Sequence, residues 1–250
     1  MRLIGALAAI VLGLQLTPAM AAELRVFTLG SAAPILQDLS AEYERATGVR
    51  LVIVKGTSGE TRNRILAEQG DVGIINTTLL AELEPKGRVV PGTTAVIAKT
   101  SAGVAIRKGT TLDVSSVDKL KAAISKAASV ATVDPAGGSA LGKHFQSVAD
   151  NLGVGNELRA KLKVYAIGVA VGEAVAKGEA EIGIGFIPEF NSVANISIAG
   201  PLPGATDFSS VTTGVILEGA RDQAAARKLI EFLRTPAAHD VIRARGMEPL

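Results

Sequence analysis

The sequence predicts an α/β protein, and three observations lead to this prediction. Short apolar runs that suit buried strands alternate with stretches whose apolar residues recur every three or four positions, as on one face of a helix. Hydrophobic residues make up 48% of the 250 residues, which supports a sizeable core and excludes a disordered chain. The 27 glycines suit tight turns between closely packed elements.

The elements follow one another in a regular order. Strands are predicted at 24–28, 51–54, 72–75, 104–106, 129–133, 164–166, 182–187 and 211–217. Helices are predicted at 33–46, 59–69, 115–127, 140–152, 170–177, 221–234 and 235–246. Gly48 ends the first helix, and Thr235-Pro236 is a cap followed by proline that begins the last one. The alternation predicts a mostly parallel sheet. The sequence has no repeats and no low-complexity linker that would divide it into independent domains.

The first 22 residues are typical of a secretory signal peptide. Arg2 precedes an apolar run over 3–14, and small residues around Ala21 and Ala22 suit a cleavage site. The apolar run is shorter than the roughly 20 residues of a membrane-spanning helix. We therefore expect export to the periplasm and a mature, monomeric chain that begins near Glu23.

Composition excludes several classes of function. The 26 Lys and Arg nearly balance the 24 Asp and Glu, and aromatic residues are only 3%, so a basic nucleic-acid-binding surface is not expected. The chain contains no cysteine, which excludes thiol catalysis and cysteine-based metal sites. Its two histidines, His144 and His239, have no metal-ligand spacing with carboxylates. We expect neither a metal nor a cofactor.

Four predicted strands end in short turns that precede a helix. These turns are rich in glycine and hydroxyl residues and lie at 28–32, 55–59, 134–140 and 166–169. Free backbone N–H groups and the positive end of the helix dipole favour an anion at such a turn. An ordinary helix cap explains any one of them. Because ligands of open α/β sheets bind beyond the carboxyl ends of the strands, four such turns favour a shared anion site.

Residues 137–143 also match the G-x-x-x-x-G-K pattern of nucleotide-binding loops. His144 stands where Ser or Thr would hold magnesium, and an exported protein meets little ATP. Glycine-rich backbone that approaches a small anion is the better interpretation. His144 beside Ser139 lacks the G-x-S-x-G context of a nucleophile, and Glu60 and Glu189 are interpreted as solvated surface charges.

Several segments together resemble the periplasmic molybdate-binding proteins of ABC transporters and their relatives. They are the stretch 24–39, the Thr57-Ser58 turn, and residues 178–184, 229–233 and 236–238. The resemblance implies a type II periplasmic-binding fold with a ligand cleft between two lobes. It places lobe 1 at 23–106 plus 213–250 and lobe 2 at 107–212, with hinges near 106–109 and 211–214.

The resemblance also implies a set of ligand-binding residues and a partner. The partner is an ABC permease in the inner membrane. A tyrosine that supplies a hydroxyl in the family falls at Phe186, which has none. The implied ligand-binding residues are Gly30, Ser31, Thr57, Ser58, Ser139, Ala140, Gly168, Val169 and Phe186.

Two functions follow. The first is a non-enzymatic binding protein for a small oxyanion such as molybdate or tungstate, because a site made only of hydroxyl and amide donors favours a fully deprotonated anion. The alternative is a binder of a small di- or tricarboxylate, or a periplasmic enzyme similar to the aconitate isomerases. An isomerase needs a base beside the substrate, for which the candidates are His144, Glu60 and Glu189.

Overall fold

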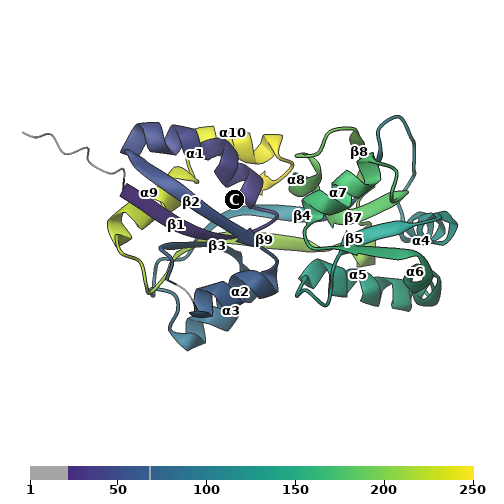
Figure 1. Cartoon of the computed structure of the whole chain (residues 1–250), viewed down its shortest axis with the longest axis horizontal. Helices are drawn as coiled ribbons and strands as arrows, with labels where there is room; N and C mark the ends of the chain where they lie inside the picture. Colours follow the sequence, from purple (N-terminus) through teal and green to yellow (C-terminus); the bar gives the residue numbers. More distant parts are fainter. Residues whose placement is uncertain (1–21, 68) are drawn as a thin grey trace, which may run out of the picture.

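The computed structural model describes residues 22–67 and 69–250. Residues 1–21 of the predicted signal peptide lie outside the described residues. Two α/β lobes lie side by side, each with a sheet between helices (Figure 1). This arrangement confirms the predicted two-lobed α/β fold.

In lobe 1 the strand order is β2-β1-β3-β9-β4, with β10 beside β4. Its strands are β1 (Ala22–Leu29), β2 (Val49–Gly56), β3 (Val72–Asn76), β9 (Ser209–Ile216), β10 (Glu248–Pro249) and the first part of β4 (Ala95–Arg107). The helices α1 (Ala33–Thr47), α9 (Gln223–Phe232) and α10 (Pro236–Ala244) cover one face, and α2 (Ser58–Ala67) and α3 (Thr77–Leu83) cover the other (Figure 1). Neighbouring residues of β1 supply the two sides of the core, because Val26 packs with the first group and Phe27 with the second.

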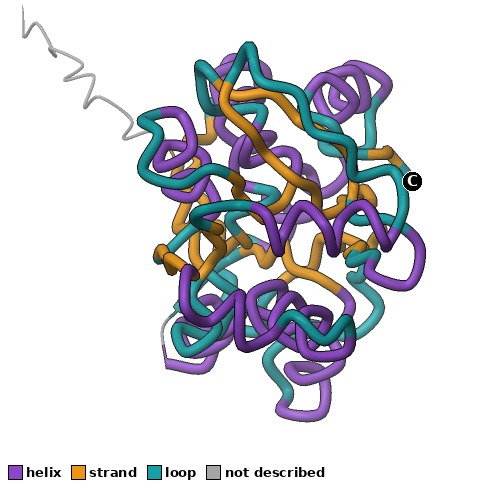
Figure 2. Tube along the Cα trace, turned by 90° about the vertical axis from the view of Figure 1, so that its right-hand side faces the viewer, coloured by secondary structure: helices purple, strands orange, loops and turns teal. Residues whose placement is uncertain are grey.

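Lobe 2 has the strand order β4-β7-β5-β6, and β8 also pairs with β4. Its strands are β5 (Val130–Val133), β6 (Leu162–Tyr165), β7 (Ile182–Phe186) and β8 (Ile196–Pro201). Its helices are α4 (Val117–Lys126), α5 (Ala140–Asn151), α6 (Gly155–Lys161), α7 (Gly168–Ala176) and α8 (Ile187–Phe190). Figure 2 looks onto this end of the molecule and shows the strands between helices.

Strand β4 runs through both lobes. Its residues 95–101 pair with β9, and residues 102–106 pair with β7. The change of partner therefore falls between Ser101 and Ala102, and on the returning strand beside Ser209. The predicted hinges near 106–109 and 211–214 lie a few residues beyond these points, and the residue ranges given for the lobes stay a prediction.

The sheet is mixed rather than mostly parallel. Strands β1, β2 and β3 are parallel, as are β5, β6 and β7. Strands β4 and β9 run antiparallel to each other, and they pair antiparallel with β7 and β3 respectively. The apolar pattern identifies β9 as a strand but carries no sign of its direction, which the crossing between lobes sets.

Within the two described ranges, none of the helices has both the length and the apolar character that crossing a membrane requires.

Candidate functional site

A cavity of about 50 Å³ lies between the lobes. Five strands end at it: β1 at Leu29, β2 at Gly56, β3 at Asn76, β5 at Val133 and β7 at Phe186. This is the position that the fold favours for a ligand, beyond the carboxyl ends of parallel strands. Because a water molecule needs about 10–15 Å³ on this measure, the space suits a small ion or molecule of a few heavy atoms.

Lobe 1 brings two serines to the cavity. Ser31 follows β1 in the turn before α1, and Ser58 is the first residue of α2. Ser31 is only 4% exposed, yet neither its hydroxyl nor its amide has a hydrogen-bond partner among the described residues. The same holds for Ser58. Both residues therefore keep two donors each for a ligand, as their place at helix N-termini predicts.

Thr57 lines the cavity but has a different role. Its hydroxyl donates to the carbonyl of Gly137 at 3.0 Å, which links lobe 1 to lobe 2. Its amide donates to Oε2 of Glu60 at 2.8 Å, and the amide of Glu60 donates to Oγ1 of Thr57 at 3.2 Å. This is a capping box at the start of α2. The hydroxyl hydrogen of Thr57 is already in use, so we assign this residue to lobe closure.

Lobe 2 brings Ser139 and Ala140 to the cavity. Ser139 caps α5 by accepting a hydrogen bond from the amide of Gly142 at 3.0 Å. A hydroxyl that accepts a bond still has its own hydrogen to donate. The amide of Ala140 has no partner in the described part of the chain. The loop that resembles a nucleotide-binding pattern is thus a capped helix start that faces the cavity.

The predicted amide donor at residue 168 or 169 meets a different outcome. Gly168 lines the cavity, but its amide donates to Oε1 of Glu189 at 3.0 Å. Val169 lines a neighbouring cavity of about 130 Å³ rather than the main one. The N-terminus of α7 therefore binds a side chain of the protein where the sequence predicts a ligand.

Glu189 is the main correction to the sequence analysis. It lies on α8, only 4% exposed, and lines both cavities. A Cβ atom added at Gly30 would lie 2.7 Å from one of its oxygens, and one added at Gly168 would lie 2.4 Å from the other. Only glycine at both positions leaves room for the carboxyl. The interpretation of Glu189 as a solvated surface charge is wrong.

Burial raises the pKa of Glu189 from 4.5 to about 7. The hydrogen bond from the Gly168 amide and the charge of Lys55 on β2 oppose this rise in part. Lys55 lines the neighbouring cavity, and its charge does not offset the loss of solvation. The sequence predicts a site made of hydrogen-bond donors alone. The carboxyl of Glu189 shows that this prediction is wrong.

Apolar side chains form one wall of the cavity. Phe186 lies there as predicted, and its ring is 5.9 Å from that of Phe208. Sequence reasoning missed Phe208, which precedes β9, and Asn76, which ends β3 and caps α3 through a bond from the amide of Leu79 at 2.8 Å. Asn76 had the same strand-to-helix signal as the serines, whereas Phe208 had none.

The other candidate bases lie elsewhere. The Nε2 atom of His144 is 3.0 Å from the carbonyl of Thr206, and the centroid of its ring lies 4.7 Å from that of Phe208, with the two rings tilted by 37°. It does not line the cavity. Glu60 caps α2, as described above. In the part of the chain that the structure describes, no group of three or more His, Asp or Glu side chains is placed to hold a metal ion.

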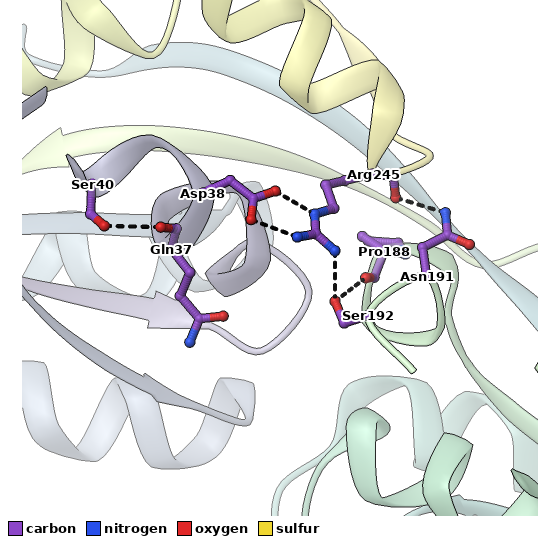
Figure 3. A network of polar contacts seen from close by, with 7 residues as sticks. All are labelled: Gln37, Asp38, Ser40, Pro188, Asn191, Ser192 and Arg245. Atoms are coloured by element: carbon purple, nitrogen blue, oxygen red, sulfur yellow. Dashed lines mark hydrogen bonds and ion pairs between the residues drawn. The ribbon is translucent and has the colours of Figure 1, made fainter. Parts of the chain in front are cut away.

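The lobes also touch on either side of the cavity. The amide of Gly59 donates to the carbonyl of Gly138 at 3.3 Å, and a Cβ atom at Gly59 would lie 3.0 Å from the Cα atom of Gly138. On the other side, Arg245 forms two hydrogen bonds with Asp38 of α1 and one, at 3.3 Å, with Ser192 of lobe 2 (Figure 3). The structure therefore has the two lobes in direct contact around the cavity.

Fold and cleft together define a two-lobed solute-binding protein. The family of bacterial extracellular solute-binding proteins matches residues 24–248. The chain belongs to this family, and the match confirms the resemblance drawn from the sequence.

Individual relatives differ in what their names state. An aconitate isomerase from Pseudomonas sp. is 28% identical over 245 residues, which are 94% of this chain and 92% of that protein. The periplasmic molybdate-binding protein of Azotobacter vinelandii is 21% identical, with a TM-score of 0.73 over 90% of this chain and 98% of that one. The substrate-binding domain of a molybdenum ABC transporter from Clostridium difficile is 18% identical, with a TM-score of 0.69 over 92% and 99%. At these identities the two structures show the shared fold alone.

Proposed function

We propose that this protein is a periplasmic solute-binding component of an ABC uptake system that clamps a small oxyanion between its lobes. The observation that carries the proposal is the convergence of unpartnered donors on one cavity. Ser31 and Ser58 come from lobe 1, and Ser139 and Ala140 from lobe 2. Helix N-termini supply the positive potential, so no cationic side chain is required in the cavity. Molybdate and tungstate are the first ligands to test.

The ligand is found by measuring the shift in unfolding temperature with molybdate, tungstate, sulfate, phosphate, citrate and aconitate. An anion at about 100 times its dissociation constant adds roughly 2.7 kcal/mol to the free energy of unfolding. The monomeric state and the permease partner belong to the same proposal. Failure of every anion to raise the unfolding temperature would contradict it.

Ser31→Ala and Ser58→Ala test the site itself. Each removes a hydroxyl that we expect to donate to a charged ligand, a bond worth roughly 1.5–3 kcal/mol, so affinity should fall about ten- to a hundredfold. Neither hydroxyl bonds to another residue in the described ranges, so the unfolding temperature without ligand should change little. Ser40→Ala is the matched control, since Ser40 lies half-buried on α1, away from the cavity, and its hydroxyl donates to the carbonyl of Gln37 (Figure 3). Full affinity in both site variants would end the assignment.

Phe186→Tyr is the companion variant. Phe186 lines the cavity at the position where the resemblance to the molybdate-binding proteins implies a tyrosine hydroxyl. If the site is an oxyanion site that lacks one donor, the added hydroxyl should tighten molybdate binding, as titration calorimetry would measure. A parent protein that binds a carboxylate while neither form binds molybdate favours the organic-acid alternative.

A second candidate function is isomerisation of a small unsaturated acid. Glu189 favours it, because a buried carboxyl whose pKa is raised to about 7 is suited to moving protons near neutral pH, and the isomerase relative covers nearly the whole chain. Of the three bases considered from the sequence, it is the one that lines the cavity. Proton NMR of cis- and trans-aconitate incubated with the protein tests this function. Interconversion that is lost in Glu189→Gln supports it, and no interconversion refutes it.

A further inference from the structure

The carboxyl of Glu189 has acceptor capacity that the protein does not use. Within the described residues its only hydrogen bond comes from the amide of Gly168 to Oε1. Oε2 has no hydrogen-bond partner there, although the side chain is only 4% exposed and lines the cavity. This oxygen is not one of the fully buried unpaired atoms of the described residues, so it can accept a hydrogen bond from a molecule in the cavity.

An ionised Glu189 repels a fully deprotonated anion. The oxygens of such an anion only accept hydrogen bonds, and none of the described residues that line this cavity is a cation. Among the residues that the structure describes, Lys55 is the only other titratable side chain lining either of the two cavities at Glu189, and it lies in the neighbouring one. Two like charges in such a space repel each other unless a proton lies between them.

We propose that the bound anion and Glu189 share one proton, which comes either with the ligand or from solution. An anion that carries its own donor hydrogen, such as hydrogen phosphate or a hydroxy acid, keeps that hydrogen, donates it in a hydrogen bond to the Glu189 carboxylate and binds without proton uptake. An anion without a donor, such as sulfate, binds only when Glu189 is protonated and donates. This inference rests on the proposed function, and it adds the rule by which the cleft selects its ligand.

The test compares anions that differ in one hydrogen donor. Sulfate and phosphate form the inorganic pair, and propionate and lactate form the organic pair. Titration calorimetry between pH 6 and pH 8.5, in two buffers with different heats of ionisation, gives both the affinity and the number of protons taken up. For sulfate or propionate we expect little proton uptake at pH 6, where the free carboxyl already holds its proton, and about one proton at pH 8.5, with an affinity that falls about tenfold per pH unit at the alkaline end. For phosphate or lactate we expect no uptake.

Glu189→Gln separates the carboxyl from the rest of the cavity. Its amide keeps a donor at every pH, so sulfate should bind at pH 8.5 at least tenfold more tightly than to the parent, with no proton uptake. Glu231→Gln, an exposed residue of α9, is the matched control and should behave as the parent. The proton count on the parent needs no variant, so the test survives a variant that fails to fold.

The outcomes are distinguishable. Anions that bind with no difference between the members of a pair, no proton uptake and no pH dependence overturn the shared proton and leave the proposed function intact. Binding of none of the four anions at any pH overturns the shared proton, and the proposed function falls with it only if molybdate and tungstate also fail to bind. Proton uptake with sulfate but not propionate, or with propionate but not sulfate, supports the shared proton. It also shows whether the cleft takes an inorganic or an organic anion.

Discussion

Glu189 should make the ligand-free protein less stable at neutral pH than at acid pH. Its folded pKa of about 7 lies above its ordinary value of 4.5. The folded state therefore holds a proton that the unfolded chain has released, and the stabilisation from that proton is complete below pH 4.5. It declines between pH 4.5 and 7 and is lost above the folded pKa. At about 1.4 kcal/mol per pH unit, the loss is about 3 kcal/mol.

Urea unfolding of protein freed of ligand by dialysis, at pH 4.5 and at pH 8, measures this loss. We compare the parent with Glu189→Gln, because other groups also titrate and contribute equally to both. The parent should lose about 3 kcal/mol more than the variant between the two pH values. Glu231→Gln, which removes an exposed carboxyl, should keep the behaviour of the parent. Equal losses in the parent and in Glu189→Gln would refute the reasoning.

Two further variants test closure and stability separately. Gly59→Ala places a Cβ atom 3.0 Å from the Cα atom of Gly138 in the other lobe. Ligand affinity measured by calorimetry should therefore fall several-fold, while the unfolding temperature without ligand stays level or rises. Unchanged affinity would show that ligand binding does not need this contact between the lobes. Asp71, only 1% exposed, accepts hydrogen bonds from the amide of Arg25 and from the amide and guanidinium of Arg221. Burial raises the pKa of Asp71, but these hydrogen bonds together lower it overall. Asp71→Asn should therefore lower the free energy of unfolding, measured in urea, by about 2–3 kcal/mol at pH 7, and by less as the pH falls through the folded pKa. An equal cost at pH 3 and pH 7 would contradict this.

The sequence was sufficient for the fold class and for much of the cavity lining, because both depend on local patterns. A buried strand followed by a small hydroxyl residue and a helix marks Ser31, Ser58 and Ser139 without knowledge of the tertiary structure. The same pattern marks Asn76, which ends a buried strand and caps the helix that follows, so the sequence alone also indicates that residue.

Glu189 was out of reach for a physical reason. It lies in a helix of four residues after Phe186, where neither periodicity nor a cap sets it apart from a surface charge. Its burial depends on space left by two glycines, Gly30 before α1 and Gly168 at the start of α7, which are distant in sequence. Such a residue becomes visible only when the packing between elements is known. The direction of β9 and the point where β4 changes partner are likewise tertiary properties.

The two lobes offer a ligand unlike chemistry, and this difference ties binding to closure. Lobe 1 presents the free hydroxyls of Ser31 and Ser58, whereas lobe 2 presents a carboxyl and an apolar wall beside the hydroxyl of Ser139. The hydrogen bonds that join the lobes beside these donors, from Thr57 and Gly59, contribute only about 0.5–1.5 kcal/mol each. A ligand shifts the balance between open and closed lobes only by its differential contacts with the two states. An anion that bonds to the serines of lobe 1 and shares a proton with Glu189 of lobe 2 makes those contacts in the closed state alone, so proton content and lobe closure are selected together.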